Sequence, residues 1–144
     1  MTKLFSDFDE WIAGHIEVDG FPLVVRARAS LPDEALRNTY QHLICICWEY
    51  DANDAGLPKK SELPAIYEFE ELVENYFNDG DTASLAAAVT GHGEKEWRYY
   101  TKSVEDFMQE FNELLSGQDK RPVTLQAFVD DEWNALQELQ DSGT

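Results

Sequence analysis

The part of the sequence that most constrains the fold is a glycine-rich turn in the middle of the chain, at residues 89–100, which read VTGHGEKEWRYY. An apolar strand enters a turn that contains Gly91 and Gly93, and an aromatic strand leaves it, which is the pattern of a β-hairpin. Glycine adopts the positive φ angles of tight turns without steric cost. The other elements can therefore be counted outward from this hairpin.

The strand that leaves the turn has two faces, because successive side chains of a strand point in opposite directions. Trp97 and Tyr99 share one face, which we assign to the core, while Arg98 and Tyr100 share the other. Arg98 beside a tyrosine could clamp a carboxylate or stack on an aromatic ring. Together with His92 in the turn, Arg98 and Tyr100 are our candidate ligand-binding residues. The alternative is that Arg98 pairs with a neighbouring glutamate.

Periodicity predicts the remaining elements. An alternating segment at residues 11–18 precedes Asp19-Gly20, a residue pair typical of type I′ hairpin turns, and a second strand follows at 21–29. Residues 42–50 are apolar on both faces, which is typical of a central strand covered on both sides. Helical stripes follow at 61–78 and from Ser103 to about 115, strands at 84–90 and 122–129, and a short last helix that carries Trp133.

The order of these elements predicts an α+β fold. After an N-terminal β-hairpin, the elements follow the βαββαβ order of a ferredoxin-like antiparallel sheet with its helices on one face, and a short C-terminal helix ends the chain. The hairpin should extend the sheet or cover its other face. With 144 residues, the chain is predicted to be a single domain over 1–144, with an ordered core at about 5–140.

The charge of the chain is strongly negative, with 29 acidic against 11 basic residues and a formal charge of −18. One interpretation is a soluble, self-repelling surface, and the other is an acidic face that docks on a basic protein. Direct binding to nucleic acid is not expected, because it requires clustered Lys and Arg, and the same charge disfavours anionic membranes. Our candidate docking residues lie on one helix and before the last helix: Glu68, Glu70, Glu71, Glu74, Asp130 and Asp131.

The sequence carries no recognisable catalytic or cofactor motif. It has no GxSxG, Walker or CxxC pattern, and its three histidines are scattered. Cys45 and Cys47 lie two residues apart on one predicted strand, where a disulfide between them fits poorly, so we expect free thiols in the core. We therefore predict no catalytic residues, no metal site and no cofactor.

The expected location is the cytoplasm. The first residues, MTKLFSDFDEW, become acidic early and contain no apolar segment, so they do not resemble a signal peptide. No apolar run approaches the roughly 20 residues of a membrane-spanning helix. Free thiols also suit a reducing compartment.

A set of short motifs resembles a known family. Gly56-Leu57-Pro58, Thr90-Gly91-x-Gly93, Trp97-x-Tyr99-Tyr100 and Asp131-x-Trp133 are similar to those of the bacterial domain of unknown function 695, over about residues 11–139. The family provides no catalytic residues to carry over. Some of its chains also contain a domain similar to regulator of ribonuclease E activity B, a small acidic protein that inhibits its nuclease by direct binding. The resemblance thus implies a regulator of this kind.

Three functions follow from these observations. The leading one is a non-enzymatic, acidic protein-interaction or regulatory module of the bacterial cytosol, with a basic protein surface as its partner. The alternative is a small-ligand or enzymatic site over the sheet near Arg98 and Tyr100. The third is a homodimer in which a second copy buries the sheet face.

Overall fold

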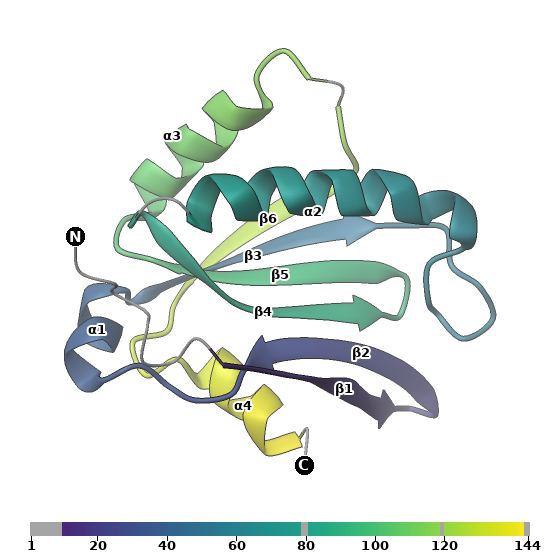
Figure 1. Cartoon of the computed structure of the whole chain (residues 1–144), viewed down its shortest axis with the longest axis horizontal. Helices are drawn as coiled ribbons and strands as arrows, with labels where there is room; N and C mark the ends of the chain where they lie inside the picture. Colours follow the sequence, from purple (N-terminus) through teal and green to yellow (C-terminus); the bar gives the residue numbers. More distant parts are fainter. Residues whose placement is uncertain (1–9, 79–80, 119, 143–144) are drawn as a thin grey trace.

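Six strands pair into one antiparallel sheet in the computed structural model, which describes residues 10–78, 81–118 and 120–142 (Figure 1). The strand order across the sheet is β1-β2-β4-β5-β3-β6. The predicted start of the ordered core, at about residue 5, lies outside the described residues. The strands are β1 (Trp11–Val18), β2 (Phe21–Arg28), β3 (His42–Glu49), β4 (Ala83–Gly91), β5 (Glu94–Thr101) and β6 (Val123–Val129).

Two tight hairpins set the register of the sheet. Asp19 and Gly20 have φ angles of 54° and 82°, and His92 and Gly93 have φ angles of 52° and 86°. Positive φ at both central residues is the signature of a type I′ turn, whose twist matches that of the strands it joins. The first hairpin extends the sheet, since β2 pairs with β4 in an antiparallel register that aligns Val25 with Val89.

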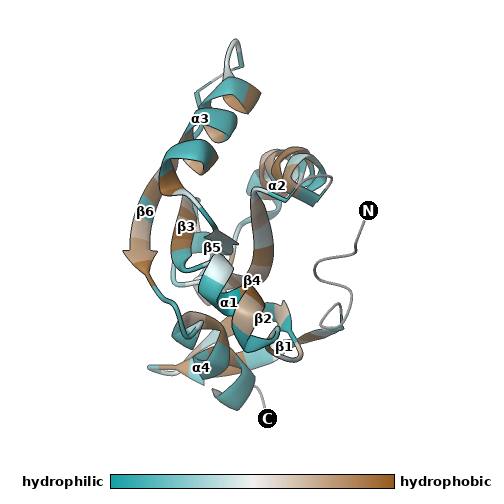
Figure 2. Ribbon diagram, turned by 90° about the vertical axis from the view of Figure 1, so that its left-hand side faces the viewer, coloured by the Kyte–Doolittle hydropathy of each residue, from teal (hydrophilic) through white to brown (hydrophobic). Residues whose placement is uncertain are grey.

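The two long helices cover one face of the sheet. After a short 3₁₀ turn, η2 (Lys60–Glu62), helix α2 (Leu63–Asn78) runs roughly along the strands, and α3 (Val104–Leu115) packs beside it (Figures 1 and 2). The Ser103 hydroxyl caps α3 by accepting a hydrogen bond from the backbone N–H of Asp106 at 3.1 Å. Phe69 and Phe77 of α2 anchor a first core against the face that bears Trp97 and Tyr99.

A second core fills the opposite face. Helices α1 (Glu34–Thr39) and α4 (Asn134–Ser142) contribute to it, with Trp133, Leu136 and Leu139 buried against the sheet. The expected placement of the two long helices on one face is thus confirmed for α2 and α3, while α4, to which no face was assigned, covers part of the other face. The stripe Trp133, Leu136 and Leu139 indicated that α4 is amphipathic, but a stripe cannot say which face of a sheet receives it.

The central strand β3 is buried on both sides, as its doubly apolar sequence predicts. Ile44 and Ile46 belong to the first core, and Leu43 and Cys45 belong to the second. Fully burying one such aliphatic side chain contributes about 1.5–3 kcal/mol. Among the described residues, no helix combines the length and the apolar character that crossing a bilayer requires.

Candidate functional site

The region around Arg98 and Tyr100 lies between the sheet and helix α4. Strand β6 ends at Val129, and the chain then turns through Asp130–Trp133 into α4. Trp133 adopts a positive φ of 58°, and its indole N–H donates a hydrogen bond to the carbonyl of Tyr40 at 2.8 Å. Its ring stacks on Tyr100 with centroids 3.9 Å apart and planes at 5°. Stacking and burial together fix the first turn of α4 to the sheet.

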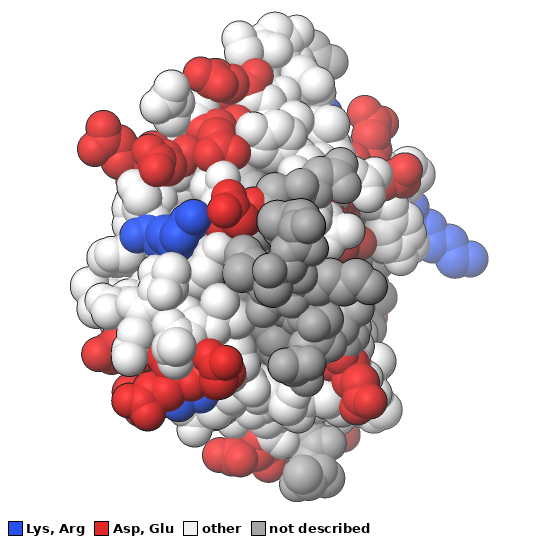
Figure 3. Space-filling view, turned by 60° about the vertical axis from the view of Figure 1, so that its left-hand side comes forward, with Lys and Arg blue, Asp and Glu red and all other residues white. Residues whose placement is uncertain are grey.

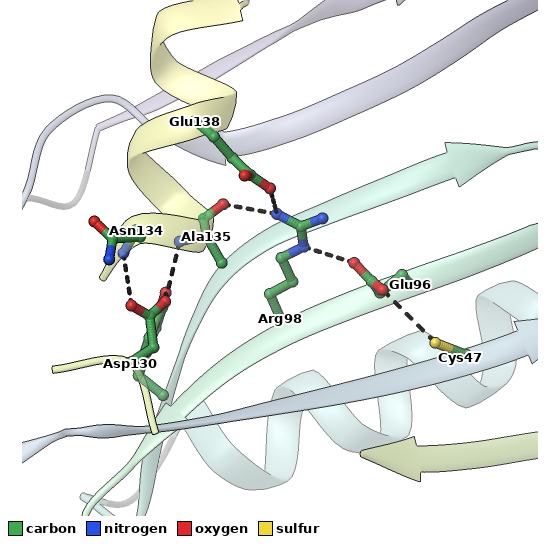
Figure 4. A network of polar contacts seen from close by, with 8 residues as sticks. Cys47, Glu96, Arg98, Asp130, Asn134, Ala135 and Glu138 are labelled. Atoms are coloured by element: carbon green, nitrogen blue, oxygen red, sulfur yellow. Dashed lines mark hydrogen bonds and ion pairs between the residues drawn. The ribbon is translucent and has the colours of Figure 1, made fainter. Parts of the chain in front are cut away.

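Arg98 is held by three acceptors inside the protein. Its Nε donates to Glu96 at 2.6 Å, and its NH1 donates to the carbonyl of Ala135 at 2.7 Å and to Glu138 at 3.1 Å (Figure 4). Burial alone would lower the pKa of Arg98, but Glu96 and Glu138 raise it on balance. The guanidinium therefore stays charged and fastens α4 to β5. A carboxylate ligand would have to displace one of these glutamates.

Tyr100 is fully buried and donates its hydroxyl to Asp130 at 2.6 Å. Burial, and then the bond to Asp130, raise the pKa of Tyr100 far above its ordinary value. The same carboxylate accepts the backbone N–H groups of Asn134 at 2.8 Å and Ala135 at 3.0 Å (Figure 4). The Asp130 carboxylate therefore caps the N-terminus of α4, and Tyr100 remains a phenol at neutral pH.

His92 does not join this group. It is an exposed residue of the β4–β5 turn, with its ring edge-on to Phe21 at 5.8 Å. The adjacent N–H of Gly93 donates to the carbonyl of Gly56 at 3.0 Å, so it is not directed at an external anion. A side chain at Gly91 would collide with Leu23 and with the carbonyl of Pro22. Position 91 therefore requires glycine because β2 approaches the backbone closely there. The structure thus brings Arg98 and Tyr100 together beneath α4 and leaves His92 in the turn.

The two thiols of β3 lie on the same face of the sheet as Arg98 of β5, because Cys45 is aligned with Arg98. Cys45 is buried, and Cys47 is half-buried and donates to Glu96 at 3.7 Å. Both cysteines are free. Burial first, and then the charge of Glu96, raise the pKa of each thiol to about 12. Both groups are therefore poor nucleophiles at neutral pH, because the thiolate is the reactive form.

The candidate docking acids divide into two groups. Glu68, Glu71 and Asp131 are exposed, and the side chain of Glu68 keeps 78% of its surface. Glu70 and Glu74 bend toward the sheet instead, and Asp130 is buried as described above. Only the first group can meet a partner without rearrangement.

A partly buried ion network explains why Glu70 and Glu74 bend inward. Glu70 accepts from Lys95 at 2.6 Å and from the indole of Trp97 at 2.8 Å, and Arg26 bonds Glu74 at 2.6 Å. Burial would raise the pKa of Glu70, but Lys95 and Trp97 lower it on balance. Sequence reasoning missed this network. The available signal was that Lys95 shares a strand face with Trp97, so a cation points toward the helix layer.

Tyr99 lies at the inner edge of this network. Its hydroxyl is the buried polar side-chain atom that finds no hydrogen-bond partner among the described residues. Burial, with Glu74 next, raises the pKa of Tyr99 well above its ordinary value, so the group is neutral. Across the described part of the chain, no three His, Cys, Asp or Glu side chains gather in a way that could hold a metal ion.

Comparison with known proteins places the chain in a family without assigning it an activity. Residues 9–139 match the model of a family of unknown function, DUF695. No curated protein and no solved structure matches the chain. The function must therefore be argued from the geometry described above.

Proposed function

The chain belongs to the DUF695 family, and from its geometry we propose that it is a non-enzymatic interaction module that docks on a basic protein surface. The observation that carries the proposal is the charge of the outer helix layer. Every charged residue of α2 and of α3 is acidic. We call the exposed members of this set the acidic helix layer: Glu68, Glu71, Glu105, Asp106 and Glu113.

The acidic helix layer is suited to recognition by charge. Its carboxylates project from two neighbouring helices that are fixed to the sheet by the first core, so they form a rigid surface. Figure 3 shows acidic side chains in clusters across one side of the molecule, with few basic ones between them. A surface of one sign steers a partner of the other sign and suppresses wrong partners by repulsion. Nucleic acids would be repelled for the same reason.

The groups that could have supported an enzymatic or ligand site are engaged internally. Arg98 donates to Glu96, Ala135 and Glu138, and Tyr100 is a buried phenol that donates to Asp130. The raised pKa values of Cys45 and Cys47 keep both thiols protonated. These contacts favour the interaction module over a site beneath α4.

Two finer points accompany the proposal. We propose that the segment β3-α2-β4-β5-α3-β6 is a ferredoxin-like unit, because its strands run β6-β3-β5-β4 across the sheet, and that the β1–β2 hairpin extends it. We also propose that the protein works in the bacterial cytosol, where free thiols remain reduced. A ribonuclease, the partner implied by the family resemblance, is one candidate for the experiment below.

The test compares two variants of equal charge. The first neutralises the acidic helix layer at four positions (Glu68→Gln, Glu71→Gln, Glu105→Gln and Glu113→Gln), and the control neutralises four exposed acids elsewhere (Glu17→Gln, Glu34→Gln, Asp54→Asn and Glu94→Gln). Proteins that the immobilised chain captures from a bacterial cytosolic extract are identified, and the most enriched one is purified. Its affinity for each variant is then measured by calorimetry at low and high salt.

We expect the helix-layer variant to lose about ten-fold or more in affinity, the control to stay within about two-fold, and added salt to weaken binding to the unmodified chain. Equal losses in the two variants would mean that net charge alone matters and would contradict a defined docking surface. The proposal also fails if no protein is enriched, or if binding does not depend on salt.

A further inference from the structure

Strand β6 ends the sheet with an unpaired outer edge. Its inner edge pairs with β3, and among the described residues no strand pairs with its outer edge. Asp130 donates its backbone N–H to Gln41, and Pro122 accepts from Glu49, so the peptide groups of the even-numbered residues face β3. Because the pattern of an antiparallel strand repeats every two residues, the peptide groups of Leu125, Ala127 and Val129 face outward.

This edge lacks the features by which proteins usually protect a terminal strand. Natural edges carry charged residues, proline, glycine kinks or bulges that prevent pairing with another chain. Strand β1, at the other end of the sheet, contains Gly14 and Glu17. Strand β6 reads VTLQAFV, without charge, glycine or proline, and its register with β3 is continuous.

The side chains at the end of β6 are also exposed although they are apolar. Phe128 keeps 48% of its surface and Val129 keeps 73%. The two residues lie on opposite faces of the sheet, since Phe128 is aligned with Leu43 of the second core, while Val129 follows it in the alternation. Single exposed apolar residues are common, but two at an unprotected edge point to a contact on both faces of that edge.

We propose that β6 pairs with β6 of a second copy of this chain, antiparallel across a two-fold axis at Gln126. In this register all the residues of the strand are paired, and two of the facing pairs combine a large with a small side chain. Thr124 lies opposite Phe128 of the second copy, and Leu125 lies opposite Ala127 of the second copy. Such cross-strand pairs are the unit of sheet stabilisation.

The hydrogen-bond pattern fits the same register. The residues with outward peptide groups are odd-numbered, and the register pairs odd with odd, so these groups meet as hydrogen-bonded pairs. Leu125, Ala127 and Val129 of each copy donate, giving about six bonds between the chains. The N–H of Val123 forms no bond between the chains, because it already donates to the carbonyl of Arg121 at 2.8 Å.

Charges at the ends of the strand favour a second copy as the occupant. The exposed Lys120 precedes β6, and the exposed Asp131 and Glu132 follow it. An antiparallel arrangement centred on Gln126 brings Lys120 of each copy toward these acids of the other. Between the two ends the paired strands are uncharged, so two chains of formal charge −18 meet where repulsion is weakest.

The dimer differs from docking on a basic partner in its response to salt. Salt screens the repulsion between two acidic chains, so the dimer should strengthen as salt is raised, whereas binding to a basic protein should weaken. The dimer is also distinct from one that buries the face of the sheet, because α4 covers part of that face. The two proposals therefore stand or fall independently.

The first test uses matched proline variants and sedimentation of the whole chain. Ala127→Pro removes an outward N–H, which proline allows at a sheet edge. Ala13→Pro is the control, since Ala29 donates to Glu10 and the peptide group of Ala13 thus faces away from β2. At about 100 µM we expect twice the 16.5 kDa chain mass for the wild type and for Ala13→Pro, and the chain mass for Ala127→Pro. A monomeric wild type at low and high salt overturns the proposal.

The second test reads the register and does not depend on the proline variant folding. In a chain whose Cys45 and Cys47 are changed to alanine, Gln126→Cys places two thiols across the axis in a non-hydrogen-bonded pair, whose Cα separation of about 4.5 Å suits a disulfide. We expect mild oxidation to link Gln126→Cys chains covalently and to leave Thr124→Cys chains unlinked. Equal linking of both variants, or of neither, overturns the proposed register.

Discussion

Replacing Asp130 is the sharpest test of how the second core is held together. Its carboxylate accepts two backbone N–H groups of α4 and the hydroxyl of Tyr100. Removing a cap costs about 1 kcal/mol. Leaving the fully buried Tyr100 hydroxyl without an acceptor costs about 1–3 kcal/mol more. We therefore expect Asp130→Ala to lower the free energy of unfolding by about 2–4 kcal/mol.

Urea unfolding followed by far-UV circular dichroism and tryptophan fluorescence measures this loss. The matched control is Asp131→Ala, which removes the same group from the exposed neighbour and should change the free energy by less than about 0.5 kcal/mol. Asp130→Asn keeps an acceptor for the helix and for the phenol, so we expect an intermediate loss of about 1 kcal/mol.

A double-mutant cycle isolates the bond between Tyr100 and Asp130. With Tyr100→Phe in place, no hydroxyl is left unpaired, so Asp130→Ala should then cost only the cap, about 1 kcal/mol. The expected coupling is therefore the cost of the unpaired hydroxyl, about 1–3 kcal/mol. The reasoning is refuted if Asp130→Ala is no more destabilising than Asp131→Ala, or if the two changes in the cycle are additive.

Two further predictions concern titrating groups. The folded state lowers the pKa of Glu70, so the ionised Glu70 carboxylate contributes its full stability above the ordinary glutamate pKa of about 4.3, and this contribution is lost as the pH falls below that value. In urea titrations at a series of pH values, Glu70→Gln should therefore weaken the fall in the free energy of unfolding at acid pH, and Glu68→Gln should not. A pKa of about 12 makes the Cys47 thiolate roughly a thousand-fold scarcer than at the ordinary value of 9.0. Alkylation of Cys47 at pH 8 should therefore be far slower in the folded chain than in urea, and equal rates would contradict the raised pKa.

Local patterns predicted the strands well because each strand has its own alternation and its own turn residues. The bounds of β1 match the prediction, β5 is the aromatic strand expected after the glycine-rich turn, and Asp19-Gly20 forms the expected turn. The expected face of Trp97 and Tyr99 is also correct, since both are buried in the first core. These features depend on neighbours within a few residues, which is the range over which sequence periodicity is informative.

The candidate site could be predicted only in part because it depends on long-range packing. The sequence placed Arg98 and Tyr100 on one face, and α4 then covered that face with Ala135 and Glu138 from the far end of the chain. Likewise, Glu68 and Glu70 are both acidic residues of the same helix, and only the position of Lys95 on β5 determines that Glu70 forms an ion pair with it. Charge patterns on a helix cannot show which acids reach a cation on a distant strand.

The contact between α4 and β2 has a consequence for synthesis on the ribosome. Gln140 donates to the carbonyl of Arg28 across 112 positions of sequence, so the surface that β2 presents is completed only when the last helix has been made. At synthesis rates of about 5–20 residues per second, this interval is on the order of ten seconds. During it the apolar side of the first hairpin stays uncovered in the nascent chain, and this is the period when a chaperone would have most to bind.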